Sequence, residues 1–136
     1  MNGLIERYKS FLDEGKTERE CVRRTIALAE ANGYRRLESV ESLKCGDKVY
    51  VEDYEKAIAL FHIGSEPMEK GMNILGAHID SPRLDIKMNP LYESEGLVYL
   101  DTHYYGGIKK YQWVAMPLAI HGVVVKTTGE KINVVL

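Results

Sequence analysis

Apolar residues recur at intervals of three and four positions along the first third of the chain, which predicts two helices. Those of the first helix are Leu4, Ile5, Tyr8, Phe11 and Leu12, and Gly15 interrupts the pattern. Thr17 followed by Glu20 has the form of a capping box, in which each residue bonds the backbone amide of the other. The second helix should therefore begin after Thr17 and end at Asn32-Gly33, where glycine adopts a positive φ without strain.

From Lys48 onward the apolar positions form short runs that predict strands at 49–51, 57–63 and 72–79. The last two runs are nearly all apolar, as in strands that are buried on both faces. This pattern favours a mixed sheet covered by helices. The segment between the helices and these runs is polar and irregular.

The rest of the chain, after Pro90, predicts antiparallel β structure. Its apolar runs are 97–100, 114–125, which Pro117 interrupts, and 132–136. The final run stops in mid-pattern without a polar tail, and an exposed apolar edge favours aggregation. We therefore expect a truncated piece of a longer protein, or a last strand that pairs with another chain.

Composition and charge argue against several classes of partner and of location. The 18 basic and 20 acidic residues are interspersed and leave a net charge of −2, which argues against nucleic-acid and anionic-membrane partners. No run approaches the roughly 20 apolar residues of a membrane span, and the N-terminus lacks secretory-signal features, so we expect a cytoplasmic protein. Cys21 and Cys45 lack the spacing of a zinc or redox motif. We expect two reduced thiols, Cys21 in the core and Cys45 beside a turn.

The segment 73–87 carries the strongest chemical signal. An apolar run ends in small residues, and His78 and Asp80 follow where a strand should leave the sheet. Ligands collect at the carboxyl ends of strands in open α/β sheets. A neutral imidazole there can bind zinc, and a nearby carboxylate can fix its tautomer and orientation. Taken alone, two such residues are more often a hydrogen-bonded pair or a turn than a metal site.

Three other histidines have weaker signals. Asp101 and His103 form a second pair at spacing two, but this spacing places any two side chains on one face of a strand. A role in binding stays open for this pair. His62 and His121 lie in apolar runs and are expected in the core or in an interface.

The remaining motifs argue against a nucleotide-binding loop and a serine nucleophile, and they leave a role for two lysines open. Lys109 and Lys110 beside Gly106-Gly107 could bind an acidic side chain, and a solvated turn explains them equally well. The two glycines lack the context of a nucleotide-binding loop. Ser81 lies outside any nucleophile elbow, and its neighbour Asp80 does not by itself make it a nucleophile activated by a base.

The longer context of His78 resembles a known family. The sequence from Gly76 to Leu84, followed by Lys87 and Asn89-Pro90-Leu91-Tyr92, is similar to the first metal-ligand motif of the M18 metallo-aminopeptidases, the aspartyl aminopeptidase group. Downstream, Tyr104-Tyr105-Gly106-Gly107, Trp113 and the segment 121–125 resemble the stretch that enters the inserted β domain of that family. The resemblance covers essentially the whole chain.

The resemblance implies a peptidase site with two zinc ions and a glutamate as general base. His78 matches the first zinc ligand of the family, and Asp80 matches the acidic residue that steers this histidine. The other ligands and the glutamate follow the inserted domain in that family, beyond the last residue of this sequence. Because a catalytic zinc takes three protein ligands, we expect these 136 residues alone to bind no stoichiometric zinc and to be inactive.

We therefore predict an α/β fold: the N-terminal portion of a helix-covered mixed-sheet metallopeptidase domain at 1–92, followed by the start of an antiparallel β insert domain at 93–136. The whole enzyme would remove N-terminal, possibly acidic, residues from peptides and would form homo-oligomers. The alternative is a non-catalytic module of the same fold that associates through its exposed strands. A short hydrolase completed by ligands from a partner chain is a third reading.

Overall fold

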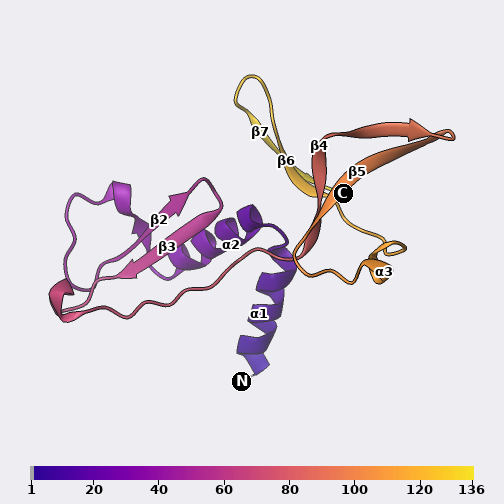
Figure 1. Ribbon diagram of the computed structural model, residues 1–136. Coiled ribbons are helices and arrows are strands. Elements are labelled where there is room, and N and C mark those ends of the chain that lie inside the picture. The colour runs from indigo at the N-terminus through magenta and orange to yellow at the C-terminus, as the bar shows by residue number, and fades with distance from the viewer. Residues whose placement is uncertain (1) are drawn as a thin grey trace. The chain divides into compact units, whose positions relative to one another are not determined.

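The computed structural model describes residues 2–136. The chain divides into two compact units, Met1–Ile79 and Asp80–Leu136, and each is described by itself below. Figure 1 shows the order of their helices and strands.

Two helices open the first unit, as the sequence predicts. They are α1 (Asn2–Glu14) and α2 (Glu18–Ala31). Thr17 and Glu20 form the expected capping box, so the amides of Thr17 and Glu20 have side-chain partners. At the other end the Asn32 amide bonds backwards into the helix, and Gly33 follows at φ +84°, a conformation that glycine adopts without strain. Both predicted ends of α2 are confirmed.

The sheet of this unit is mixed, which confirms the predicted class. Its strands are β1 (Arg35–Arg36), β2 (Lys48–Asp53) and β3 (Ala57–His62), and the short 3₁₀ helices η1 (Leu37–Ser39) and η2 (Met68–Lys70) complete the unit. The order is β1-β2-β3, with β1 parallel and β3 antiparallel to β2. The strands predicted at 49–51 and 57–63 are therefore confirmed.

A small core lies between α2 and β2. Its buried residues are Cys21, Val22 and Ala29 of the helix and Val49 and Tyr50 of the strand. Burial of these apolar side chains, at about 25 cal/mol per Å² removed from water, is what keeps the helix against the sheet.

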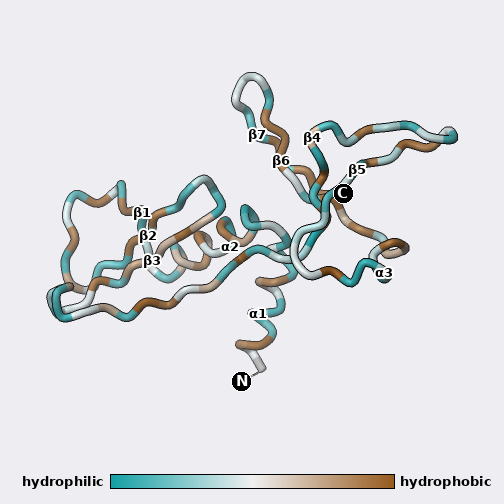
Figure 2. Tube along the Cα trace, viewed as in Figure 1, coloured by the Kyte–Doolittle hydropathy of each residue, from teal (hydrophilic) through white to brown (hydrophobic). Residues whose placement is uncertain are grey.

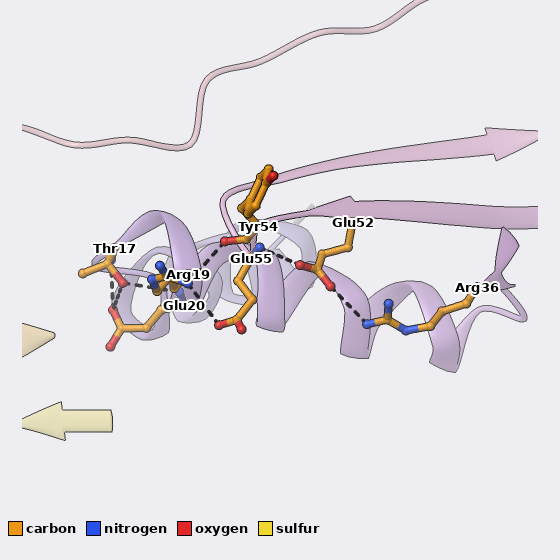
Figure 3. Close-up of polar contacts among 7 residues, drawn as sticks. All are labelled: Thr17, Arg19, Glu20, Arg36, Glu52, Tyr54 and Glu55. Atoms are coloured by element: carbon orange, nitrogen blue, oxygen red, sulfur yellow. Dashed lines mark hydrogen bonds and ion pairs between the residues drawn. The ribbon is translucent and has the colours of Figure 1, made fainter. Parts of the chain in front are cut away.

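Polar contacts tie the start of α2 to the β2–β3 turn (Figure 3). The Arg19 guanidinium donates to the carbonyl of Tyr54 and to the Glu55 carboxylate, both at 3.2 Å. Tyr54 and Glu55 have φ values of 49° and 58°, the left-handed region that tight hairpins require. Glu52 accepts from the Glu55 amide and from Arg36, so the turn is held from both sides.

Two expectations about the apolar runs are wrong. The side chains of β3 are mostly exposed rather than buried on both faces, because β3 is an edge strand of a three-stranded sheet. The run 72–79 is irregular instead of a strand, and Leu75 is 100% exposed within it. Backbone groups of a strand need a neighbouring strand as partner, and none of the strands at residues 2–136 pairs with this run. Figure 2 shows how apolar much of this segment is.

The second unit consists of two antiparallel hairpins, as expected after Pro90, and one short helix. The first hairpin joins β4 (Arg83–Ser94) to β5 (Leu97–Tyr105), and the second joins β6 (His121–Val125) to β7 (Lys131–Val135). The helix α3 (Lys110–Trp113) lies between them in the sequence. Of the run 114–125, only the last five residues form a strand; the residues around Pro117 are irregular.

Strand β4 is a finding that the sequence analysis did not predict. Charged and apolar residues alternate from Arg83 to Met88, which is the pattern of a half-exposed strand. Ile86 pairs with Thr102, and the next paired residues are Leu91 and Leu100. The four β4 residues between Ile86 and Leu91 therefore lie opposite a single residue of β5, Asp101. This bulge accommodates Pro90, which has no amide to donate.

Candidate functional site

His78 lies on the irregular segment that precedes β4. Its side chain is exposed, and the segment 71–82 contains no helix or strand. The expected position at the carboxyl end of a strand is therefore wrong, because 72–79 forms no strand. The imidazole nevertheless lies at the surface, where a metal could reach it, and not in packed hydrocarbon.

Asp80, the second predicted site residue, is held by a tyrosine from the end of β5. The Tyr105 hydroxyl donates to Asp80 Oδ2 at 2.6 Å. A distance of about 2.5–2.7 Å is typical of a hydroxyl that donates to a charged carboxylate. Two residues that lie 25 positions apart in the sequence are thus brought together by the β4–β5 hairpin.

Arg83 holds the ring of the same tyrosine. It is paired with Tyr105 in the β4–β5 register, and its guanidinium carbon lies 4.2 Å from the centroid of the Tyr105 ring. Its Nε donates to Asp85 at 2.7 Å and its Nη1 to the Ser81 carbonyl at 3.4 Å. The planar guanidinium therefore stacks on the phenol while its edge is bonded to β4 and to the residue after Asp80.

The turn after β5 packs closely on the loop that carries Asp80. Gly106 has φ +74°, and a Cβ placed there would lie 3.3 Å from Pro82 Cα. A larger residue would both be strained and displace Pro82. The backbone on either side of the Tyr105–Asp80 hydrogen bond is thereby fixed.

The weaker candidates have other contacts. Asp101 accepts a hydrogen bond from Lys87 at 2.9 Å, and the His103 ring stacks on Tyr104 with centroids 5.5 Å apart. The Lys110 ammonium lies 3.9 Å from the centroid of the Tyr104 ring. The binding roles considered for these residues stay predictions.

The remaining histidines are not in a core. His62 is exposed at the end of β3, and His121 is half-buried at the start of β6. The expectation of core positions is wrong for both, since β3 and β6 each lie at the edge of a small sheet. An interface role stays a prediction.

The cysteines lie as the sequence predicts. Both are free thiols; Cys21 is buried, and Cys45 is exposed beside a turn. Burial, with a smaller contribution from Glu20 and Glu18, raises the pKa of the Cys21 thiol. This thiol is therefore a structural group of the core rather than a nucleophile.

His78 and Asp80 suit one ligand position of a zinc site. An exposed imidazole followed by a carboxylate suits a ligand with its supporting acid. Within residues 2–136, however, no three His, Cys, Asp or Glu side chains lie close enough to hold a metal, and a catalytic zinc takes three protein ligands. These residues therefore do not form a complete site by themselves.

Comparison with known proteins identifies the family. The sequence model of the aminopeptidase I zinc metalloproteases (M18) matches residues 11–136. The chain belongs to the M18 family. A probable M18 family aminopeptidase 1 of Clostridium acetobutylicum is 58% identical over 135 residues, which are 96% of this chain and 29% of the relative. A Thermotoga maritima protein of the same name is 42% identical over 134 residues, 98% of this chain and 30% of the relative.

Solved M18 structures share the fold. Aminopeptidase I from Borrelia burgdorferi matches with a TM-score of 0.90 at 40% identity, over 98% of this chain and 34% of that one. An M18 aminopeptidase from Thermotoga maritima matches with a TM-score of 0.92 at 40% identity, over 99% of this chain and 30% of that one. The chain thus spans about 30% of the M18 proteins it matches, and the predicted fragment of the metallopeptidase fold is confirmed.

The helices were also compared with the length and hydropathy of a membrane span. None of the helices described between residues 2 and 136 is long and apolar enough to cross a bilayer. The cytoplasmic location stays a prediction.

The sequence analysis did not predict the contact of Tyr105 with Asp80 or that of Arg83 with Tyr105. Tyr105 entered only as part of the M18 resemblance, and its separation from Asp80 gives no signal in sequence spacing. Arg83 does have a signal in the sequence. The alternation of charged and apolar residues in β4 begins with it, three residues after Asp80.

Proposed function

We propose that these residues form the N-terminal part of a zinc-dependent aminopeptidase that removes N-terminal residues from peptides. The observation that carries the proposal is the match of the M18 family model to residues 11–136. The 58% identity to a probable M18 aminopeptidase over nearly the whole chain supports it. Since that relative is more than three times as long as the match, the complete activity depends on sequence beyond these residues.

In this proposal His78 is a zinc ligand and Asp80 orients its imidazole. A carboxylate that accepts from the second ring nitrogen fixes the tautomer and raises the basicity of the ligand. Bound zinc, two ions in the complete site, would acidify a water molecule and polarise the peptide carbonyl. The other ligands come from the rest of the protein, so residues 1–136 alone are inactive.

The proposed domains divide the chain at residue 92. Residues 1–92 belong to the peptidase domain and 93–136 to the inserted β domain. Strand β4 (Arg83–Ser94) then carries the chain from one domain into the other. The β4 bulge around Pro90 supports such a passage, because bulges change the direction of a strand.

An acidic N-terminal residue is the proposed substrate preference. The support is the positive charge at Lys109 and Lys110, which are exposed beside the turn at Gly106-Gly107. An ammonium group that keeps its charge at the surface attracts a carboxylate.

Self-association through the second hairpin is the proposed oligomeric contact, and it is also what a non-catalytic module of this fold would use. Val124, Val125, Val135 and Leu136 are exposed on or beside β6 and β7. Exposed apolar side chains on a two-stranded hairpin can be covered by a second chain that pairs with its edge. Figure 2 shows the apolar positions along this hairpin.

The test uses the complete gene product that contains these residues, beside residues 1–136 alone. Hydrolysis of Asp-, Glu- and Leu-aminomethylcoumarin is measured with zinc and with chelator. We expect the complete protein to be active only with zinc, with the acidic substrates preferred, and the short chain to be inactive. His78→Ala should abolish activity and lower bound zinc.

The matched control is His62→Ala, because His62 is an exposed histidine at the end of β3, outside the site. It should leave both activity and zinc content unchanged. Full activity of His78→Ala, or a complete protein that hydrolyses none of the substrates, contradicts the proposal. Size-exclusion chromatography of the same samples distinguishes an inactive defined oligomer, which favours the non-catalytic module.

A further inference from the structure

We infer that Tyr105 is a positioning residue of the peptidase site: its hydroxyl fixes the Asp80 carboxylate that in turn orients His78. The inference rests on the proposed function and adds a residue to it. Its basis is the 2.6 Å hydrogen bond from Tyr105 Oη to Asp80 Oδ2.

The bond suits this role chemically. A carboxylate accepts on two oxygens, so a bond at Oδ2 does not compete with acceptance of an imidazole N–H at Oδ1. The phenol hydroxyl supplies a single donor at a fixed distance from a rigid ring. The bond from Tyr105 therefore restrains the rotation of Asp80 and does not itself occupy Oδ1.

Tyr105 is itself held in place. It is the last residue of β5 and is paired with Arg83, the first residue of β4. The Arg83 guanidinium covers the ring at 4.2 Å, and Asp85 holds that guanidinium at 2.7 Å. The position of the hydroxyl is thus set by the strand ladder and by a bonded arginine rather than by a mobile side chain.

The loop that carries Asp80 is also fixed to the end of β5. Gly106 follows Tyr105 at φ +74°, and its α-carbon approaches Pro82 so closely that a Cβ would lie 3.3 Å from Pro82 Cα. Donor and acceptor are consequently anchored by neighbouring backbone contacts. Such an arrangement holds a supporting carboxylate within the small tolerance that ligand orientation demands.

Tyr105→Phe separates this role from simple packing. The variant keeps the ring and its stacking with Arg83 and removes only the hydroxyl. Loss of a partner behind a metal ligand typically lowers metal affinity or activity about 10–100-fold. We expect Tyr105→Phe in the complete protein to weaken zinc binding about 10-fold in competition with a fluorescent chelator, with unchanged thermal stability of the zinc-free protein.

Tyr104→Phe is the matched control, because the neighbouring Tyr104 contacts His103 and Lys110 instead. It should leave zinc affinity unchanged. If the hydroxyl acts through Asp80, Tyr105→Phe adds little in an Asp80→Asn background, where the carboxylate is already lost. Additive losses in the double variant would overturn the inference.

The remaining outcomes separate the inference from the proposed function. A complete wild-type protein that binds zinc and hydrolyses peptides while Tyr105→Phe keeps wild-type zinc affinity overturns the inference alone. Equal losses for Tyr105→Phe and Tyr104→Phe, or a lower stability of zinc-free Tyr105→Phe that accounts for the loss, also overturn it. A wild-type protein that binds no zinc overturns the inference together with the proposed function.

Discussion

Tyr50 of β2 donates a hydrogen bond to the Glu30 carboxylate of α2 at 2.7 Å, although the tyrosine is 0% exposed. The bond satisfies the only polar group of a large buried side chain and joins the sheet to the helix that covers it. The bond to Glu30, followed by burial, raises the pKa of Tyr50. Two consequences can be measured.

Removal of this hydroxyl should loosen the first unit. Tyr50→Phe keeps the ring in the core but loses the bond to Glu30, and a net intramolecular hydrogen bond contributes about 1 kcal/mol. We expect faster hydrogen exchange of the β2 amides by a factor of about 5, since 1.4 kcal/mol corresponds to a factor of ten. Tyr54→Phe is the control because Tyr54 is 84% exposed in the β2–β3 turn. Equal protection in both variants would show that the bond contributes nothing.

The raised pKa predicts an alkaline limit to stability. A group whose pKa is higher in the folded state contributes stability that is complete below its unfolded pKa of about 10 and is lost as the pH rises through the folded value. The free energy of unfolding should thus fall more steeply above about pH 10 for the wild type than for Tyr50→Phe. Denaturant titrations of both proteins at each pH measure the difference in their free energies of unfolding. The other tyrosines are present in both proteins, so their contributions cancel in this difference. Parallel curves for the two proteins contradict the prediction.

The capping box of α2 should be needed for the local stability of that helix. Thr17 accepts from the Glu20 amide at 3.3 Å, and its own amide donates to the Glu20 carboxylate at 2.9 Å. Thr17→Ala removes the first bond and should cost about 1 kcal/mol. Hydrogen exchange in the first turn of α2 should increase accordingly. Thr17→Ser preserves the hydroxyl and should be nearly unchanged; a loss as large as that of alanine would rule out the cap as the cause.

The two thiols should differ strongly in reactivity. Cys45 is exposed, whereas Cys21 is 5% exposed and burial raises its pKa. Since the thiolate is the reactive form and must be reached by the reagent, exposed Cys45 should react rapidly with a disulfide reagent and Cys21 only after local unfolding. Cys45→Ser and Cys21→Ser isolate the two rates. A Cys45→Ser protein that reacts rapidly under native conditions would contradict the burial of Cys21.

The features that the sequence predicts correctly are local ones. The cap at Thr17 and the end of α2 at Gly33 depend on contacts within a few residues, and these are present whatever the rest of the chain does. The antiparallel hairpins likewise follow from runs that are adjacent in sequence. Local pattern is sufficient for such elements because their partners are near neighbours.

The features that it does not predict depend on distant partners. The run 72–79 has the composition of a buried strand, but no strand at residues 2–136 pairs with it, so it is irregular. The contact of Tyr105 with Asp80 spans 25 residues and depends on the register of a bulged hairpin. His78 and Asp80 are candidates from the sequence because an imidazole two positions from a carboxylate suits a metal ligand with its supporting acid and because their surroundings resemble the M18 motif. The tyrosine that donates to the Asp80 carboxylate is visible only in the structure.

Gly106 and Gly107 provide a final test of how the loop at Asp80 is fixed. Gly106 has φ +74° and would place a Cβ 3.3 Å from Pro82 Cα, whereas a Cβ at Gly107 meets no atom within 4 Å. Gly106→Ala should therefore cost about 1–2 kcal/mol from the left-handed backbone alone, with a further loss from the displacement of Pro82.

The displacement distinguishes this variant from a simple loss of stability. Because Pro82 lies two residues from Asp80, its movement should break the bond to Tyr105 and increase hydrogen exchange at the end of β5, while exchange in α2 of the other unit stays unchanged. Gly107→Ala should leave the protection of β5 as in the wild type. If both alanine variants loosen β5 to the same extent, the contact with Pro82 is not what holds Asp80 beside Tyr105.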